Sequence, residues 1–323
     1  SRRGAVPFLS EETRLSWWVQ PLVRLFAALA LPFLVPAVIT GVMWVLPGDP
    51  ASIICPPAIC TGTAELAARW GLDQGPVHFY TNWLTNAAVG EFGNSWRVAQ
   101  GYPVSALLWE SLPTTAGLVL LAMVPMLIGA FGAALGWLPR RLDPLWQAMG
   151  LIPAVILALA FAAVVQINFG ALSHDGWPGM LRLLFGGLVL GIADGAFAGA
   201  VLGTRSTLEE ELKQRYVQIA VMRGESVLSN TLPNVLPSLI GQFRARMLHV
   251  MSGAVVVEVV LGIPGLGELL WEGTLQQDFG VVLTAAWAFA LLSAALLFAQ
   301  AVGEIAVATH VRRAPRGVMG GAA

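Results

Sequence analysis

Four charged residues interrupt two otherwise apolar stretches of this sequence. Asp194 lies within residues 183–204, and Arg244, Arg246 and Glu258 lie within residues 236–263. A charged side chain at mid-membrane costs about 2.5 to 3.5 kcal/mol on insertion scales unless it is paired or hydrated. A helix rises about 1.5 Å per residue, so Asp194 and the two arginines lie at similar distances from the cytoplasmic ends of their spans. We predict that Asp194 pairs with Arg244 or Arg246 near a solute pathway; alternatively, both arginines extend to the headgroups and Asp194 binds neighbouring backbone.

Cys55 and Cys60 are the only cysteines, and Pro56-Pro57-Ala58-Ile59 separates them. An oxidising compartment favours a disulfide between them. Two free thiols are the alternative, because the prolines restrict the approach of the sulfur atoms. Two cysteines without a neighbouring histidine are too few for a structural zinc ion, so we expect no metal site.

The elements that must hold these residues are membrane helices. The sequence is 56% hydrophobic and only 11% charged, whereas soluble domains carry about a quarter charged residues. A helix of roughly 20 apolar residues crosses the bilayer. Four stretches of that length contain no Asp, Glu, Lys or Arg: residues 25–48, 111–139, 144–174 and 279–303. With the two charged stretches they predict an all-α integral membrane protein of about six transmembrane helices.

Basic residues fix the predicted orientation, because Lys and Arg near membrane ends stay in the cytoplasm. The first apolar stretch is too long for a cleaved signal peptide, so we expect the N-terminus inside. Thirteen basic residues then fall in cytoplasmic segments and three in outer segments. Both termini are therefore expected in the cytoplasm. The predicted segments are a cytoplasmic N-terminal segment (1–21), a first transmembrane helix (22–46), a periplasmic loop region (47–110), a transmembrane core (111–309) containing a cytoplasmic loop (205–233), and a cytoplasmic tail (310–323).

The cytoplasmic loop predicts a polar helix over residues 204–224, with acids ahead of bases, such as Glu211 before Arg215. The loop contains Gln218-Ile219-Ala220, then Gly224, then Asn234-Val235-Leu236-Pro237. This spacing resembles the cytoplasmic loop of binding-protein-dependent ABC importer permeases, in the dipeptide, oligopeptide and nickel branch. The second alanine, the glycine and Leu-Pro match that loop pattern, and Gln218 replaces its glutamate.

Other stretches carry the same resemblance, which runs from about residue 22 to residue 309 and is strongest to the dipeptide permease B type. They occur in the family's order, at residues 47–50, 70–73, 90–95, 112–115, 253–258 and 264–267. The resemblance implies a type I ABC importer permease in the bacterial inner membrane. It also implies a second homologous permease, two ATPase subunits that bind ATP and Mg, and a periplasmic solute-binding protein. No cofactor is expected in this chain, and its partners include lipid but no nucleic acid.

The resemblance assigns a mechanical role to the cytoplasmic loop. A short permease helix in such importers sits in a cleft of the ATPase, so Tyr216, Gln218 and Ala220 are expected near the docking surface. Gly224 supplies a backbone turn that disfavours a side chain, and Leu236 and Pro237 complete the coupling loop. An ordinary surface helix with a glycine cap is the alternative.

Glu258 precedes Pro264-Gly265-Leu266-Gly267 near the expected outer end of the fifth span. The resemblance implies an outer gate region for Glu258, Pro264, Gly265 and Gly267. Alternatively, the proline and glycines simply end the helix.

Three other function classes are alternatives. An enzyme is disfavoured because the sequence has neither a Gly-x-x-x-x-Gly-Lys-Ser/Thr phosphate loop nor a His-Glu-x-x-His motif. An ion-gradient-driven transporter would need coupling carboxylates in the membrane, and Asp194 is the one candidate. A permease-like scaffold of another complex is the third possibility. The sequence leaves the solute open between peptides, nickel complexes and other compounds.

Overall fold

The computed structural model describes residues 11–45, 51–52, 55, 61–169 and 176–313. The named elements of this described part are helices. They are α1 (Glu11–Val45), α3 (Thr63–Trp70), α4 (Pro76–Ala88), α5 (Val104–Ala134), the 3-10 turn η1 (Arg140–Leu142), α6 (Asp143–Gly150), α7 (Ala154–Phe169), α8 (Gly176–Ile192), α9 (Ala196–Leu212), α10 (Arg215–Met222), α11 (Val227–Leu261), α12 (Leu266–Leu275) and α13 (Phe279–Arg313). The predicted all-α class is confirmed.

Three helices of the described part are long and apolar enough to cross a membrane by themselves, namely α1, α5 and α13. Three further candidates are pairs of helices that bend at a short break. The pairs are α6 with α7 (76°), α8 with α9 (42°), and α11 with α12 (69°). Counting each pair as one span gives up to six spans, in agreement with the predicted number.

Two predicted spans are not continuous helices. The charge-free stretch 144–174 breaks before Ala154, because Pro153 lacks the N–H that would continue the helical ladder. The stretch 183–204 breaks at Asp194 and Gly195, both of which have positive φ, at 51° and 72°. Apolar length predicted one span for each of these stretches and gave no sign of a bend. The bends arise from the local backbone at Pro153 and at Asp194 and Gly195.

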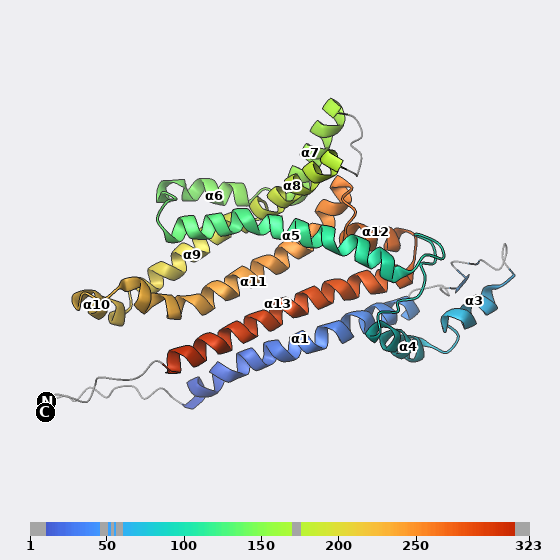
Figure 1. Ribbon diagram of the computed structural model, residues 1–323, viewed down its shortest axis with the longest axis horizontal. Helices are drawn as coiled ribbons and strands as arrows, with labels where there is room; N and C mark the ends of the chain where they lie inside the picture. Colours follow the sequence, from blue (N-terminus) through green and yellow to red (C-terminus); the bar gives the residue numbers. More distant parts are fainter. Residues whose placement is uncertain (1–10, 46–50, 53–54, 56–60, 170–175, 314–323) are drawn as a thin grey trace.

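Figure 1 shows α1 and α13 side by side and antiparallel, with α11 next to α13. Helices α5, α8 and α9 pack together on the other side of α11. The start of α1, the end of α13 and helix α10 share one end of the molecule, which we call the α10 end. Helices α3 and α4 lie at the opposite end, called the outer-loop end.

Glycines let α8 approach α5 closely. A Cβ atom on Gly191 would lie 2.4 Å from the Ala122 carbonyl oxygen, and one on Gly187 would lie 2.5 Å from the Leu121 Cβ. In lipid the hydrophobic effect does not hold helices together, and small residues at crossings allow the close van der Waals packing that does. The two helices are therefore fixed against each other by backbone contact.

Candidate functional site

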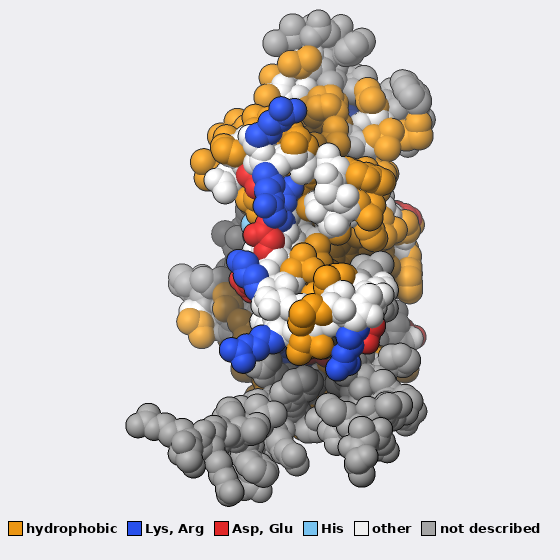
Figure 2. All heavy atoms as spheres, turned by 90° about the vertical axis from the view of Figure 1, so that its left-hand side faces the viewer, with side chains coloured by type: hydrophobic (Ala, Val, Ile, Leu, Met, Phe, Trp, Pro, Cys, Tyr) orange, Lys and Arg blue, Asp and Glu red, His pale blue; other side chains and the backbone are white. Residues whose placement is uncertain are grey.

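Helix α10 exposes apolar side chains at the α10 end. Val217 and Ala220 are buried against the protein, whereas Ile219, Val221 and Met222 are 44%, 55% and 78% exposed. Figure 2 shows that this end carries acidic and basic side chains beside an apolar surface. A short helix with an unpartnered apolar face is the form that docks into a groove of another protein.

The polar helix predicted over residues 204–224 is two helices, α9 and α10. Gln214 separates them with an extended backbone (φ −67°, ψ 142°). Because the helix breaks there, Glu211 does not meet Arg215 in helical register, and Glu211 instead accepts a hydrogen bond from the Tyr216 hydroxyl. Gln218 lies on the exposed side of α10 and donates to the Lys213 carbonyl at 3.4 Å.

Gly224 ends α10 in the left-handed conformation, with φ of 71°. Its N–H donates to the Val221 carbonyl at 3.0 Å, and the next N–H, of Glu225, donates to the Ala220 carbonyl at 2.9 Å. Space does not require glycine, since a Cβ here would meet nothing within 4 Å. The backbone conformation alone favours glycine, as the sequence predicted.

Leu236 and Pro237 lie inside α11, which already begins at Val227. Leu236 is 36% exposed, and the side chain of Pro237 lies outside the described part. The Leu-Pro part of the loop pattern therefore lies within a long helix, near its beginning, and not in the loop between two helices.

The residues of the predicted intramembrane ion pair contact other groups in the structure. The Asp194 Oδ1 accepts the Ala154 N–H at 3.1 Å, at the start of α7. Arg246 Nη1 donates to the Gly195 carbonyl at 2.9 Å, next to Asp194 in the chain. The ion pairs found among the described residues include none between Asp194 and either Arg244 or Arg246. This geometry matches the alternative for Asp194, which binds backbone, but not for Arg246, which binds a backbone carbonyl and does not extend to the headgroups.

Gly199 explains how α9 makes room for the large Arg246 side chain of α11. A Cβ on Gly199 would lie 1.8 Å from the Arg246 Nη2 atom, so the guanidinium occupies the space that a side chain would fill. Arg244, two residues earlier, has a buried Nε without a hydrogen-bond partner. The two arginines thus bring positive charge to the interior beside α9 and α13.

Glu258 is fully buried and organises the predicted gate region. The Thr115 hydroxyl of α5 donates to Glu258 Oε1 at 2.7 Å, and the Gly267 N–H donates to Oε2 at 2.6 Å. Thr115 also accepts the Leu266 N–H at 2.7 Å. The carboxylate therefore joins the start of α12 to α5 and α11.

The glycines of this elbow are required by close approach. A Cβ on Gly265 would lie 2.4 to 2.5 Å from the Glu258 carboxyl group, and one on Gly267 would lie 2.5 Å from the Val255 Cα. Pro264 stands at the break between α11 and α12. Glu258, Gly265 and Gly267 thus lie together at this elbow, whereas their gate role stays a prediction. The sequence could not identify Thr115 as a partner of Glu258.

Asp278 is a buried residue that the sequence analysis missed. Its Oδ2 accepts hydrogen bonds from the Ser95 hydroxyl at 2.6 Å and from the N–H groups of Trp96 (2.8 Å), Arg97 (2.9 Å) and Val98 (3.2 Å). Arg97 in turn reaches the Gln276 carbonyl at 3.2 Å. These contacts, which we call the Asp278 clamp, fix the segment after α4 to the junction of α12 and α13. The one signal for it in the sequence is an acidic residue that stands alone between Gln277 and the apolar stretch that begins at Phe279.

A second missed contact joins the first and last long helices. Arg24 of α1 forms an ion pair with Glu304 of α13. Gln300 donates to the same carboxylate at 2.6 Å. Arg24 is one of the thirteen basic residues that set the predicted orientation, and nothing in the sequence pointed to Glu304 as its partner.

The predicted disulfide lies partly outside the described residues. Cys55 is disulfide-bonded, and Cys60 is outside the described part, so the pairing of the two stays a prediction. Among the described residues, no group of three or more His, Cys, Asp or Glu side chains is placed to hold a metal ion.

Comparison with known proteins adds the family. Residues 125–308, more than half of the chain, match the family described as "Binding-protein-dependent transport system inner membrane component". The "Glutathione transport system permease protein GsiC" of Escherichia coli (strain K12) is 28% identical over 274 residues, covering 80% of this chain and 87% of the relative. The "Oligopeptide transport system permease protein AppB" of Bacillus subtilis (strain 168) is 29% identical over 278 residues, covering 79% and 86%.

The family match confirms the resemblance that the cytoplasmic loop and the outer stretches predicted. Its members are non-catalytic, multi-pass permease subunits of ABC importers without a cofactor of their own. Transport by such a system depends on ATPase subunits and on a solute-binding protein. The chain belongs to this family of binding-protein-dependent transport system inner membrane components.

Proposed function

We propose that this chain pairs with a second homologous permease and forms half of a pathway for peptides or peptide-like solutes. Two relatives of nearly full length are named for glutathione and oligopeptide transport, which supports this solute class. Two ATPase subunits would act on the α10 end and a periplasmic binding protein on the outer-loop end.

The observation that carries the proposal is the exposed apolar face of α10, with Met222 78% exposed on a helix of eight residues. This helix follows α9, which continues from the membrane core into the α10 end. Displacement of α10 by a closing ATPase would therefore move α9 directly. Tyr216, Gln218 and Ala220 belong to this docking helix, and Gly224 shapes its end.

The α10 end is cytoplasmic in this proposal, since most basic residues fall in segments at that end. Both termini would then be cytoplasmic, and residues 47–110 would face the periplasm. The Glu258 elbow lies toward the outer-loop end, where it would close the pathway against the periplasm. A buried carboxylate that accepts hydrogen bonds from the Thr115 hydroxyl and the Gly267 N–H gives a closed state of defined geometry.

The docking role is tested with Met222→Glu in the complex of permeases, ATPase and binding protein. The new carboxylate should abolish or weaken copurification of the ATPase, because docking would bury this charge in an apolar groove that offers it no hydrogen-bond donor. Val89→Glu is the matched control, since Val89 is similarly exposed (74%) but lies at the outer-loop end. Normal ATPase binding by Met222→Glu, or equal loss in Val89→Glu, would contradict the role of α10.

The transport role is tested in proteoliposomes that contain the whole complex. We expect uptake of radiolabelled glutathione or tetra-alanine that needs both internal ATP and the binding protein. Uptake by the chain alone under an ion gradient, without ATP, would favour the ion-gradient transporter. An intact complex that hydrolyses ATP but transports neither probe would contradict the peptide-class assignment.

A further inference from the structure

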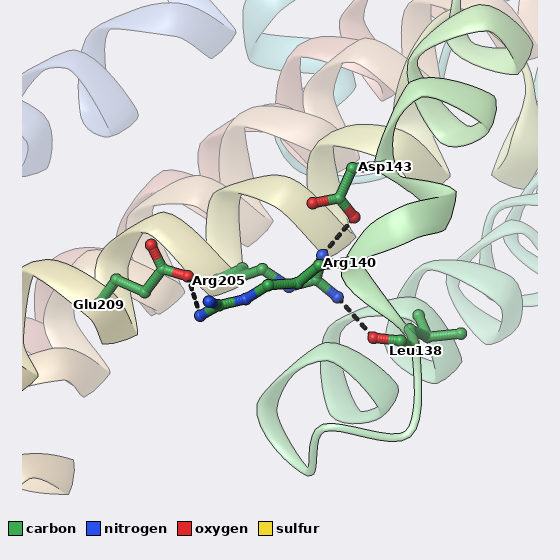
Figure 3. Close-up of polar contacts among 5 residues, drawn as sticks. All are labelled: Leu138, Arg140, Asp143, Arg205 and Glu209. Carbon is green, nitrogen blue, oxygen red and sulfur yellow. Dashed lines mark hydrogen bonds and ion pairs between the residues drawn. The ribbon is translucent and has the colours of Figure 1, made fainter.

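Arg205 of α9 contacts the connection between α5 and α6 at two points (Figure 3). Its Nη1 forms an ion pair with the Asp143 carboxylate, at the first residue of α6. Its Nη2 donates to the Leu138 carbonyl at 2.8 Å, in the turn after α5. The Arg205 and Asp143 side chains are only 11% and 25% exposed. One guanidinium therefore joins three elements.

The turn that Arg205 holds is itself firmly attached to α5. The N–H groups of Trp137 and Leu138 both donate to the Gly132 carbonyl, at 2.8 and 3.2 Å. The Leu138 side chain packs so closely on Gly132 that a Cβ there would lie 3.1 Å from the Leu138 Cγ. A force on this turn therefore acts on α5.

Apolar packing does not complete the connection between the turn and α9. A cavity of about 310 Å³ lies between them, lined by Gly136, Leu138 and Pro139 of the turn and by Leu208 and Leu212 of α9. Helices α5 and α9 pack directly farther along, where a Cβ on Gly129 would lie 2.9 Å from Phe197 and 3.0 Å from Val201. At the turn itself the space beside Leu208 and Leu212 is open, so the polar contacts of Arg205 make the connection there.

A second ion pair nearby provides a natural comparison. Arg140 pairs with Glu209 across the same two elements (Figure 3). Its side chains are 73% and 40% exposed, and it makes a single contact. Exposed pairs contribute little, because water and salt screen them.

We propose that Arg205 is a positioning residue for ATP-driven transport, which makes the turn after α5 and the start of α6 follow α9. This inference rests on the proposed docking of α10 to an ATPase. A displacement of α10 then reaches α5 and the bent α6–α7 pair as well as α9. Arginine suits the task, since its planar fork binds a carboxylate and a carbonyl together, which the single ammonium of lysine holds less rigidly.

The test measures the distance between α9 and the turn inside the intact complex. Leu135 and Leu212, which are 58% and 47% exposed, are replaced by cysteine and carry nitroxide labels. Cys55 and Cys60 are replaced by serine in this background. The label distance is compared without nucleotide and with ATP and vanadate, together with ATP hydrolysis and ATPase copurification.

For the parent protein we expect a single narrow distribution of distances between the two labels in both states, and the same for Arg140→Gln. In Arg205→Gln this distribution should become broad after vanadate trapping, while the ATPase still binds and hydrolyses ATP. If Arg205→Gln does not assemble, Arg205→Lys is used instead and should also broaden the distribution.

Two results would overturn the inference. The first is a narrow distance retained in Arg205→Gln, or in Arg205→Lys where it replaces that variant. The second is equal broadening in Arg140→Gln, which would assign the effect to any charge lost at this surface. A parent complex from which the ATPase is absent would instead contradict the docking of α10 itself, so the two failures are distinguishable.

Discussion

The Ser95 hydroxyl donates to the Asp278 carboxylate at 2.6 Å, although 183 positions separate the two residues. Asp278 is fully buried, and the same oxygen accepts three consecutive backbone N–H groups. The contact connects the segment after α4 to the end of α12. Since Glu258 holds the beginning of α12, that helix is fixed at both ends by buried carboxylates.

Asp278→Ala should therefore destabilise the outer-loop end. Loss of the acceptor leaves several buried donors unpaired, which lowers the free energy of unfolding by about 2 to 4 kcal/mol. Asp278→Asn keeps one acceptor oxygen and should cost less. Thermal unfolding and limited proteolysis of the purified complex measure both effects. Asp73→Ala, at an exposed acid of the same region, serves as the control, and a loss as large there would refute the special position of Asp278.

Gly265→Ala should disrupt the Glu258 elbow. The new Cβ would lie about 2.4 Å from the Glu258 carboxyl group. Relieving that overlap costs about 1 to 3 kcal/mol and separates Gly267 or Thr115 from the carboxylate. We expect reduced uptake with the ATPase still bound. Gly117→Ala is the control, because its Cβ would come no closer than 3.7 Å to any neighbour. Unchanged uptake in Gly265→Ala would mean that the elbow has no role in transport.

Gly224→Ala should weaken ATPase docking without any steric clash. Alanine in the left-handed conformation is strained by about 1 to 2 kcal/mol, so the end of α10 would shift. Asn tolerates this conformation better, and Gly224→Asn should retain more binding. Titration of the ATPase against the solubilised permeases measures both affinities. Equal affinities for the two variants would show that the backbone conformation at this position is unimportant.

Asp194→Asn should remain close to the parent protein. The amide oxygen can still accept the Ala154 N–H, and Asn tolerates the positive φ of this position. Asp194→Ala removes the acceptor at the start of α7 and should cost about 1 kcal/mol. Thermal unfolding and uptake are measured for both. If Asn is as damaging as Ala, the negative charge matters, and the ion pair with an arginine would have to form in another state of the transporter.

The sequence predicted the membrane class, the approximate number of spans and the family, because these depend on local composition and spacing. Apolar length defines α1, α5 and α13, and a single glycine defines the end of α10. The bends at Pro153 and Asp194 were missed, since charge-free length does not report the direction of a helix.

The partners of the buried polar groups were also beyond prediction. Thr115 meets Glu258 across 143 positions, and Ser95 meets Asp278 across 183. Neither spacing follows a helical or sheet period, so only the packing of the helices brings these groups together. The same holds for Asp194 and Arg246, whose matching depths suggested a pair although each binds backbone instead.

The ion pair between Arg24 and Glu304 constrains the order in which the protein can be built. A ribosome adds about 5 to 20 residues per second, so roughly half a minute of translation separates the two residues. Arg24 is the third residue of the apolar span 22–45, so its guanidinium can stay among the headgroups until Glu304 has been made. The contact that ties the first long helix to the last is therefore one that only forms after α13 has been synthesised.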